Sequence, residues 1–242
     1  GTELKKPLEF VLKAKPIKGY SRQVFVLTDG EVSNTQQIID LVKGCCSGSD
    51  TRVFALGVGD SVSQHLVQGM ARAGNGTAQF VLNSDDIGAK VLLQLKQAIQ
   101  PSLSEVSIEW GGVEKRQGKP TEACVLQAPY DVPPVFDSQH FLIYGIFEGN
   151  VPVPESVTIT AKSPDGPLSI QLPVKPEHKI KGKLIHTLAA RALIRDIEEG
   201  EGGYLGTGAG KNVLKQEVVR LGTKYQLAST HTSFVAVEKR TG

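Results

Sequence analysis

The sequence predicts a mixed α/β protein in three regions: a parallel sheet with helices, a β-rich antiparallel region and a short helical segment. Three observations support this. Residues 1–100 alternate continuous apolar runs with stretches of helical period. Residues 101–180 alternate apolar and polar side chains at every second position. The helical period returns within residues 181–242, which end in a predicted strand.

Two apolar runs define the predicted parallel sheet. Residues 24–27 and 53–56 are continuously apolar, which is typical of strands buried on both faces. A third strand is predicted over residues 78–82. Short connections through helices favour right-handed crossovers and parallel pairing. Asp29 and Asp60, which follow the first two strands, are therefore expected at the same edge, where such sheets bind ligands.

The helices of this first region are predicted from spacing and end signals. Asn34 is expected as an N-cap, with Gln37 at the capping-box position. Gly44 and Gly74 suit the ends of two helices. The segments expected to be helical are 4–12, 34–44, 63–73 and 87–99, and the last carries an apolar stripe of Val91, Leu92, Leu95 and Ile99.

The second and third regions show a change of period. Strands are predicted around 106–110, 141–147, 157–160 and 168–174, where no helical spacing is present. A helix follows, with Leu184, Leu188, Ala192 and Ile197 on its expected apolar face. A second helix is predicted over 212–221, ended by Gly222, and a strand over 232–237.

Composition excludes several classes of protein. The net charge of +2 gives no electrostatic signature for nucleic acid or an anionic membrane. No stretch approaches the ~20 apolar residues that span a bilayer. Cys45, Cys46 and Cys124 are an odd set with an adjacent pair, which favours a reduced compartment and an intracellular, cytoplasmic location. The first residues contain neither a Met nor a signal peptide core, so we expect a piece of a longer chain.

Four segments carry a resemblance to a known family. Residues 22–31 read RQVFVLTDGE, with a Thr-Asp-Gly after an apolar strand. The other three segments are residues 52–59, 71–78 and 232–237. Together they resemble the von Willebrand factor A (VWA) domain-containing protein 5A-like family of VIT/VWA proteins. This family is related to inter-alpha-trypsin inhibitor heavy chains. The resemblance implies a partial, Rossmann-like VWA domain at 1–100, without its first strand.

The resemblance also implies a metal site. The family's metal-ion-dependent adhesion site (MIDAS) uses an Asp-x-Ser-x-Ser loop, a loop Thr and the Asp of the Thr-Asp-Gly. Thr2 matches the loop Thr and Asp29 matches that Asp, whereas no Asp-x-Ser-x-Ser occurs in the 242 residues. Such oxygen ligands suit Mg²⁺. The alternatives are an ordinary N-cap at Thr2 and an Asp-Gly turn at Asp29. We therefore expect Mg²⁺ only in the intact parent.

The sequence contains no complete catalytic motif among those considered. Residues 206–212 are glycine-rich, but the spacing of a phosphate-binding loop is one residue short and Asn212 stands where Ser or Thr is needed. The five histidines have no zinc-type spacing. We expect a non-enzymatic module that binds a protein partner. The alternatives are an accessory region of a vault-type poly(ADP-ribose) polymerase and a secreted, matrix-binding heavy-chain relative, which an upstream signal peptide would favour.

Overall fold

The structure is a computed structural model that divides into two compact units. Unit 1 comprises Gly1–Ser104 and Pro133–Gln139, and unit 2 comprises Glu105–Val132 and His140–Gly242. The predicted region boundaries near residues 100 and 180 stay a prediction. The structure describes residues 3–18, 20–47, 49, 51–82, 86–100, 103–118, 123–136, 140–163, 165–200, 203–206 and 209–235.

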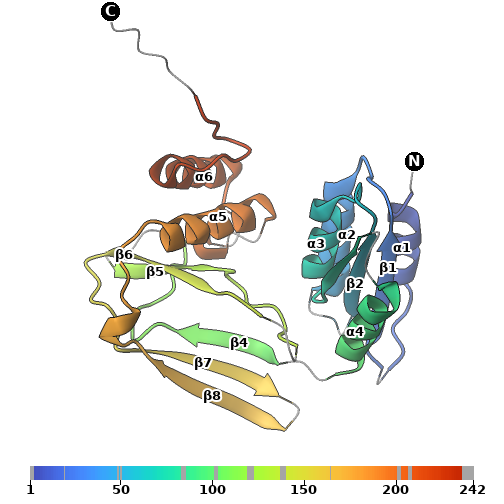
Figure 1. Ribbon diagram of the computed structural model, residues 1–242, viewed down its shortest axis with the longest axis horizontal. Coiled ribbons are helices and arrows are strands. Elements are labelled where there is room, and N and C mark those ends of the chain that lie inside the picture. The colour runs from blue at the N-terminus through green and yellow to red at the C-terminus, as the bar shows by residue number, and fades with distance from the viewer. Residues whose placement is uncertain are drawn as a thin grey trace, which may run out of the picture. The chain divides into compact units, whose positions relative to one another are not determined.

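Unit 1 contains a parallel sheet of three strands (Figure 1). These are β1 (Arg22–Thr28), β2 (Thr51–Val58) and β3 (Ala78–Val81), in the order β1-β2-β3. Residues 24–27 pair in parallel with residues 53–56, with Leu27 opposite Leu56. The predicted parallel neighbours are confirmed. The apolar runs fold in this way because both faces of β2 are covered, and residues 53–57 are all buried.

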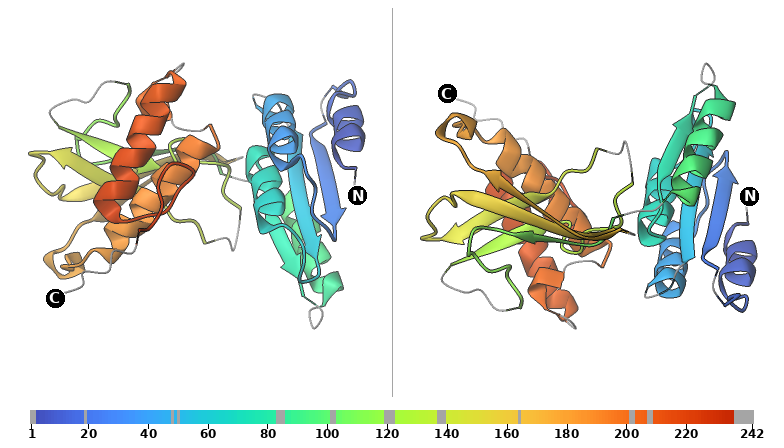
Figure 2. Two further views of the ribbon diagram at one scale, coloured as in Figure 1. Left: turned by 90° about the horizontal axis from the view of Figure 1, so that it is seen from above. Right: turned by 90° about the horizontal axis from the view of Figure 1, so that it is seen from below.

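Helices cover both faces of this sheet. Their bounds are α1 (Lys5–Leu12), α2 (Thr35–Cys46), α3 (Gln64–Ala73) and α4 (Ile87–Ile99). In Figure 2, α2 and α3 pack on one face and α4 lies on the other. The core under α1, α2 and α3 includes Leu8, Leu12, Val26, Ile38, Val42, Val53, Ala55, Leu66 and Met70. On the opposite face, the ring of Phe54 stacks on that of Phe25 and contacts that of Phe136.

The helix ends agree with the sequence only in part. Ser63 caps α3 by accepting the amide of Leu66 at 3.3 Å, and Gly74 occupies the C-cap. Asn34 holds the N-cap position of α2, but its side chain accepts no capping hydrogen bond. The predicted capping box is wrong, because Gln37 instead accepts a hydrogen bond from Lys5 Nζ at 2.9 Å. Helix α2 also continues past Gly44 to Cys46.

Helix α4 attaches to the sheet by a polar face and not by its apolar stripe. The predicted stripe is largely exposed, with Leu92 at 67% and Ile99 at 84%. The buried side chains are Gln94 and Gln97. Gln94 Nε2 donates to the carbonyls of Ala55 at 2.9 Å and Thr77 at 3.1 Å, and Thr77 Oγ1 donates to Gln97 Oε1 at 2.7 Å. The apolar spacing therefore identified the helix over residues 87–99, but it does not mark the face that is buried.

Unit 2 contains the antiparallel strands predicted for this region, together with one strand that was not predicted, β5 (Ala123–Ala128). Strands β5 and β6 (Tyr144–Gly149) form one antiparallel pair. Strands β4 (Ser104–Glu109), β7 (Ser156–Ser163) and β8 (Gly166–Pro173) form a second sheet in the order β4-β7-β8, with β7 and β8 antiparallel. Val157 and Ile159 pair with Leu172 and Ile170 on one face. This pairing explains the alternation of apolar and polar residues in the sequence.

Two long helices complete unit 2. They are α5 (Leu184–Glu198) and α6 (Lys211–Tyr225), beside short 3₁₀ turns at Pro176–His178 and Gly203–Leu205. In Figure 1, both helices lie on the side of β5 and β6 that is remote from β4, β7 and β8. Their shared core includes Leu126, Ile146, Ala189, Ala190, Leu193, Ile194, Ile197, Val218 and Leu221.

Three further predictions for unit 2 are wrong in detail. Helix α6 does not end at Gly222 but continues to Tyr225. Leu184 and Leu188 are 72% and 42% exposed, because α5 turns a neighbouring face toward the sheet. The predicted strand over 232–237 is absent from its described part, where Thr232 forms only an isolated bridge with Ser229. Residues 236 and 237 lie outside the described residues. No helix in the described part of the chain has the length and apolar character needed to cross a membrane.

Candidate functional site

The predicted site residue Asp29 lies immediately after β1, at the carboxyl edge of the parallel sheet. Its side chain is exposed, whereas Thr28 before it is buried. Thr28 Oγ1 lies 3.5 Å from both the amide and the carbonyl oxygen of Gly30. These long contacts close the turn around Asp29 and leave its carboxylate facing solvent. The buried strand thus fixes where Asp29 emerges from the sheet.

Asp60 occupies the corresponding place after β2. The register pairs Thr28 with Gly57, so the two aspartates leave neighbouring parallel strands at the same edge, as predicted. Gly59 reaches this turn with a φ of 92°, a backbone conformation that favours glycine. A cavity of about 440 Å³ lies beside Asp60, lined by Gly59, Asp60, Val62, Gln64, Gln68, Phe80, Leu82 and Lys90. Asp29 does not line this cavity.

The described residues do not form a complete metal site. Thr2 lies outside the described residues, so the structure does not test whether its side chain lies close to that of Asp29. Within the described residues, no three His, Cys, Asp or Glu side chains come together as a metal-binding group. Mg²⁺ prefers an octahedral shell of oxygen atoms, of which Asp29 would supply one charged ligand. A metal held at Asp29 requires further oxygen ligands besides this one carboxylate.

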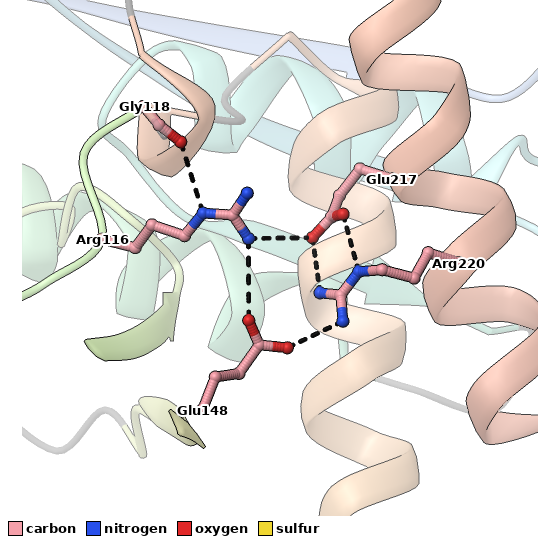
Figure 3. Close-up of polar contacts among 5 residues, drawn as sticks. All are labelled: Arg116, Gly118, Glu148, Glu217 and Arg220. Carbon is pink, nitrogen blue, oxygen red and sulfur yellow. Dashed lines mark hydrogen bonds and ion pairs between the residues drawn. The ribbon is translucent and has the colours of Figure 1, made fainter. Parts of the chain in front are cut away.

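A charge network that sequence reasoning missed lies in unit 2 (Figure 3). The guanidinium of Arg220 forms a two-pronged contact with Glu217, at 2.8 Å from Nε to Oε2 and 2.6 Å from Nη2 to Oε1. Arg220 Nη1 also donates to Glu148 Oε1 at 2.7 Å. The hydrogen bonds to Glu217, and next those to Glu148, raise the pKa of Arg220 against the opposing effect of burial.

Arg116 closes this network from a loop. Its Nη1 lies 3.5 Å from Glu217 Oε1 and 3.7 Å from Glu148 Oε2, and its Nε donates to the carbonyl of Gly118 at 3.3 Å. Arg116 and Glu217 are both buried. Two arginines and two glutamates therefore join a loop, β6 and α6 with balanced charge. This arrangement fastens elements together and leaves no carboxylate poised for acid–base chemistry.

The separation in sequence explains why the network was missed. Glu217 and Arg220 are three residues apart on one helix, which is a readable pairing signal. Arg116 and Glu217 are 101 positions apart, so nothing local in the sequence indicates their contact.

The cysteines do not indicate a nucleophile. Cys45, Cys46 and Cys124 are free thiols, and Cys46 and Cys124 are buried. Burial, followed by the charge of Cys45, raises the pKa of the Cys46 thiol to about 11. A reactive cysteine needs a lowered pKa, since the thiolate is the attacking species. Cys46 therefore behaves as a small apolar core residue.

Comparison with known proteins agrees with this geometry. The von Willebrand factor type A domain family matches residues 1–80. Von Willebrand factor A domain-containing protein 5A of Rattus norvegicus is 31% identical over 99% of this chain and 28% of its own length. Its Homo sapiens counterpart is 28% identical over 99% of this chain and 29% of its own length. The chain belongs to this family of VWA domain-containing proteins.

Other relatives extend the same result. A VWA domain-containing protein of Dictyostelium discoideum is 36% identical over 90% of this chain and 10% of its own length. The chain thus spans between a tenth and under a third of the relatives it matches. A solved von Willebrand factor type A structure from Catenulispora acidiphila covers 91% of this chain and 59% of its own, with 11% identity and a TM-score of 0.37.

Proposed function

We propose that this chain is a non-enzymatic protein-interaction module of an intracellular VWA protein, and that Asp29 supplies the charged ligand of a metal-assisted adhesion site. The observation that carries the proposal is the exposed carboxylate of Asp29, which emerges at the carboxyl edge of the sheet directly after a buried strand. Ligands of open parallel sheets bind at this edge. Membership of the VWA family supports a protein as the partner.

The proposed chemistry follows from the ligands available. The metal would be Mg²⁺, which supplies a positive charge that attracts a partner carboxylate. Asp29 contributes one negative oxygen ligand and Thr2 a neutral hydroxyl, so few protein charges would offset the cation. In this proposal the remaining ligands come from an Asp-x-Ser-x-Ser loop in a longer protein, since the 242 residues contain none.

Titration calorimetry with Mg²⁺ and Mn²⁺ tests this proposal on a longer protein that contains the missing loop. We expect Asp29→Ala to abolish metal-dependent partner binding and Thr2→Ala to weaken it less. The matched control is Asp60→Ala, which removes a carboxylate from the end of the neighbouring strand and should leave binding unchanged. The 242-residue chain alone should bind metal weakly. Partner binding that persists in excess chelator would show that Asp29 holds no functional metal.

A further inference from the structure

A second concave surface lies at the opposite end of the parallel sheet from Asp29. It is a cavity of about 960 Å³ near Arg22 and Thr51, which begin β1 and β2. Its lining comes mainly from the loop between α1 and β1, and we call it the amino-edge cavity. The lining residues are Ala14, Lys15, Pro16, Ile17, Lys18, Tyr20, Ser21, Arg22, Ser49 and Thr51.

Arg22 gives the amino-edge cavity a fixed wall. Its guanidinium donates to three carbonyls: that of Leu12 at the end of α1, at 3.0 Å, and those of Ala14 and Lys15 in the loop, at 2.7 Å and 3.1 Å. Hydrogen bonds to a charged donor are stronger than those between neutral groups. They hold the loop backbone against the start of β1, which favours a cavity formed before any partner binds. The carbonyls are thereby occupied, and the side chains of the loop are left for recognition.

The cavity lies in a strongly basic part of the sequence. Residues 3–22 contain six cationic side chains against two carboxylates, a local charge of +4 in a chain whose total is +2. Lys15 and Lys18 line the cavity, and both are exposed. Within the described residues, neither ammonium group has an ion-pair partner, and no acidic side chain lines the cavity. A concave surface with charge of one sign attracts ligands of the opposite sign.

The same surface exposes large apolar groups. Ile17 is 71% exposed and Tyr20 is 75% exposed, and both line the cavity between or beside the lysines. Single exposed apolar residues are ordinary on protein surfaces. Two of them in one basic concavity provide apolar contact and charge attraction together. Tyrosine is also among the residues that contribute most to binding interfaces.

We propose that the amino-edge cavity binds an acidic peptide segment of a partner protein, with bulky apolar side chains placed between carboxylates. The carboxylates would meet Lys15 and Lys18, and the apolar side chains would pack on Ile17 and Tyr20. A cavity admits a protruding peptide, whereas a planar lipid surface cannot enter it. This inference rests on the proposed role as a protein-interaction module, but it uses a different site and needs no metal.

Fluorescence anisotropy of the full 242-residue chain tests the proposal. The probe is a labelled peptide, Glu-Glu-Leu-Asp-Trp-Glu-Glu-Leu, measured in EDTA beside an analogue with Gln and Asn in place of the acids. We expect a dissociation constant on the order of 10–100 μM, which rises as salt screens the charges. The combined Lys15→Glu and Lys18→Glu variant should weaken binding roughly tenfold, because two attractions become repulsions. Ile17→Ser should weaken it about threefold.

Unit 2 offers a matched control. Lys179, Ile180 and Lys181 are also exposed, and they line none of the cavities described here. The combined Lys179→Glu and Lys181→Glu variant changes the net charge equally and should leave binding unchanged, as should Ile180→Ser. Equal weakening by both pairs of substitutions would show only general attraction to a basic protein and would overturn the proposal.

Three further outcomes would overturn it. One is equal binding of the uncharged analogue, and another is no binding at all. The third is tighter binding to vesicles of 70% phosphatidylcholine and 30% phosphatidylserine with the same dependence on Lys15 and Lys18, which would assign the surface to a membrane. Asp29→Ala should leave peptide binding unchanged. That variant separates the two sites, because failure at Asp29 and failure at the amino-edge cavity then appear in different measurements.

Discussion

Helices α4 and α5 both carry apolar residues at helical spacing, yet they attach to their sheets by different chemistry. Helix α5 buries Leu193 and Ile197 among apolar side chains of β5 and β6. Helix α4 buries Gln94, which donates to two backbone carbonyls at the junction of β2 and β3. The difference shows that an apolar stripe identifies a helix, while the surface beneath it decides which face is buried.

The strongest way to test this contrast is to remove a large apolar side chain from α5. Leu193 is fully buried, so Leu193→Ala should lower the free energy of unfolding of unit 2 by about 2–5 kcal/mol through lost burial and a cavity. Urea unfolding followed by fluorescence of Trp110, the single tryptophan, reports on unit 2. Leu184→Ala, at a 72% exposed position of the same helix, should change it by less than ~0.5 kcal/mol.

The charge network of unit 2 should have the next largest effect. Glu217→Gln removes the carboxylate shared by Arg116 and Arg220 and leaves Glu148 as the remaining carboxylate of the network. We expect a loss of about 2–4 kcal/mol, below the cost of an isolated buried charge because Glu148 remains. Urea unfolding followed by Trp110 fluorescence measures this loss as well. The control Glu177→Gln breaks an exposed ion pair with Lys175 and should lower the free energy of unfolding by under ~0.5 kcal/mol. If both variants lose the same free energy of unfolding, the buried network stabilises unit 2 no more than an exposed ion pair does.

The polar attachment of α4 gives the third prediction. Gln94→Leu should cost about 1–3 kcal/mol, because the buried carbonyls of Ala55 and Thr77 lose a donor. Leu92→Gln, on the exposed face, should be neutral within ~0.5 kcal/mol. Hydrogen exchange of residues 51–58 reports on this part of unit 1. If Leu92→Gln destabilises the unit more than Gln94→Leu does, the apolar face is the attached one and the structure of α4 is wrong.

The same regions show which features of the fold could be predicted from the sequence. The parallel pairing of residues 24–27 and 53–56 was predictable, because continuous apolar runs occur where both faces of a strand are covered. The placement of Asp29 and Asp60 follows directly from that pairing. The buried face of α4 was not predictable, since it depends on backbone carbonyls that the tertiary fold leaves under the helix.

The amino-edge cavity was not predicted from the sequence either, because no local sequence signal indicates it. The amino-edge cavity depends on Arg22 bonding to carbonyls seven to ten positions earlier. The sequence shows that residues 3–22 are basic, but it does not show that Lys15, Lys18 and Arg22 line one cavity. The capping box at Asn34 failed for a related reason, because Lys5 of another helix binds the side chain of Gln37.

The smallest expected effect concerns Cys46 in the core of unit 1. Its pKa is about 11 in the folded chain against an ordinary value of 9.0, because burial disfavours the thiolate. Below pH 9 the thiol is protonated in both states. As the pH rises from 9 toward 11, the unfolded chain loses this proton while the folded chain keeps it, so stability falls with rising pH. The loss should reach about 1–2 kcal/mol by pH 10.5.

Urea unfolding of unit 1 at pH 8.0 and 10.5, followed by hydrogen exchange of residues 51–58, measures this loss. Cys46→Ala is the control: it lowers stability at both pH values, but the contribution of this thiol to the slope disappears because nothing remains there to ionise. A slope that Cys46→Ala leaves unchanged would mean that the thiol is accessible to water, and that α2 packs less closely on unit 1 than the structure shows.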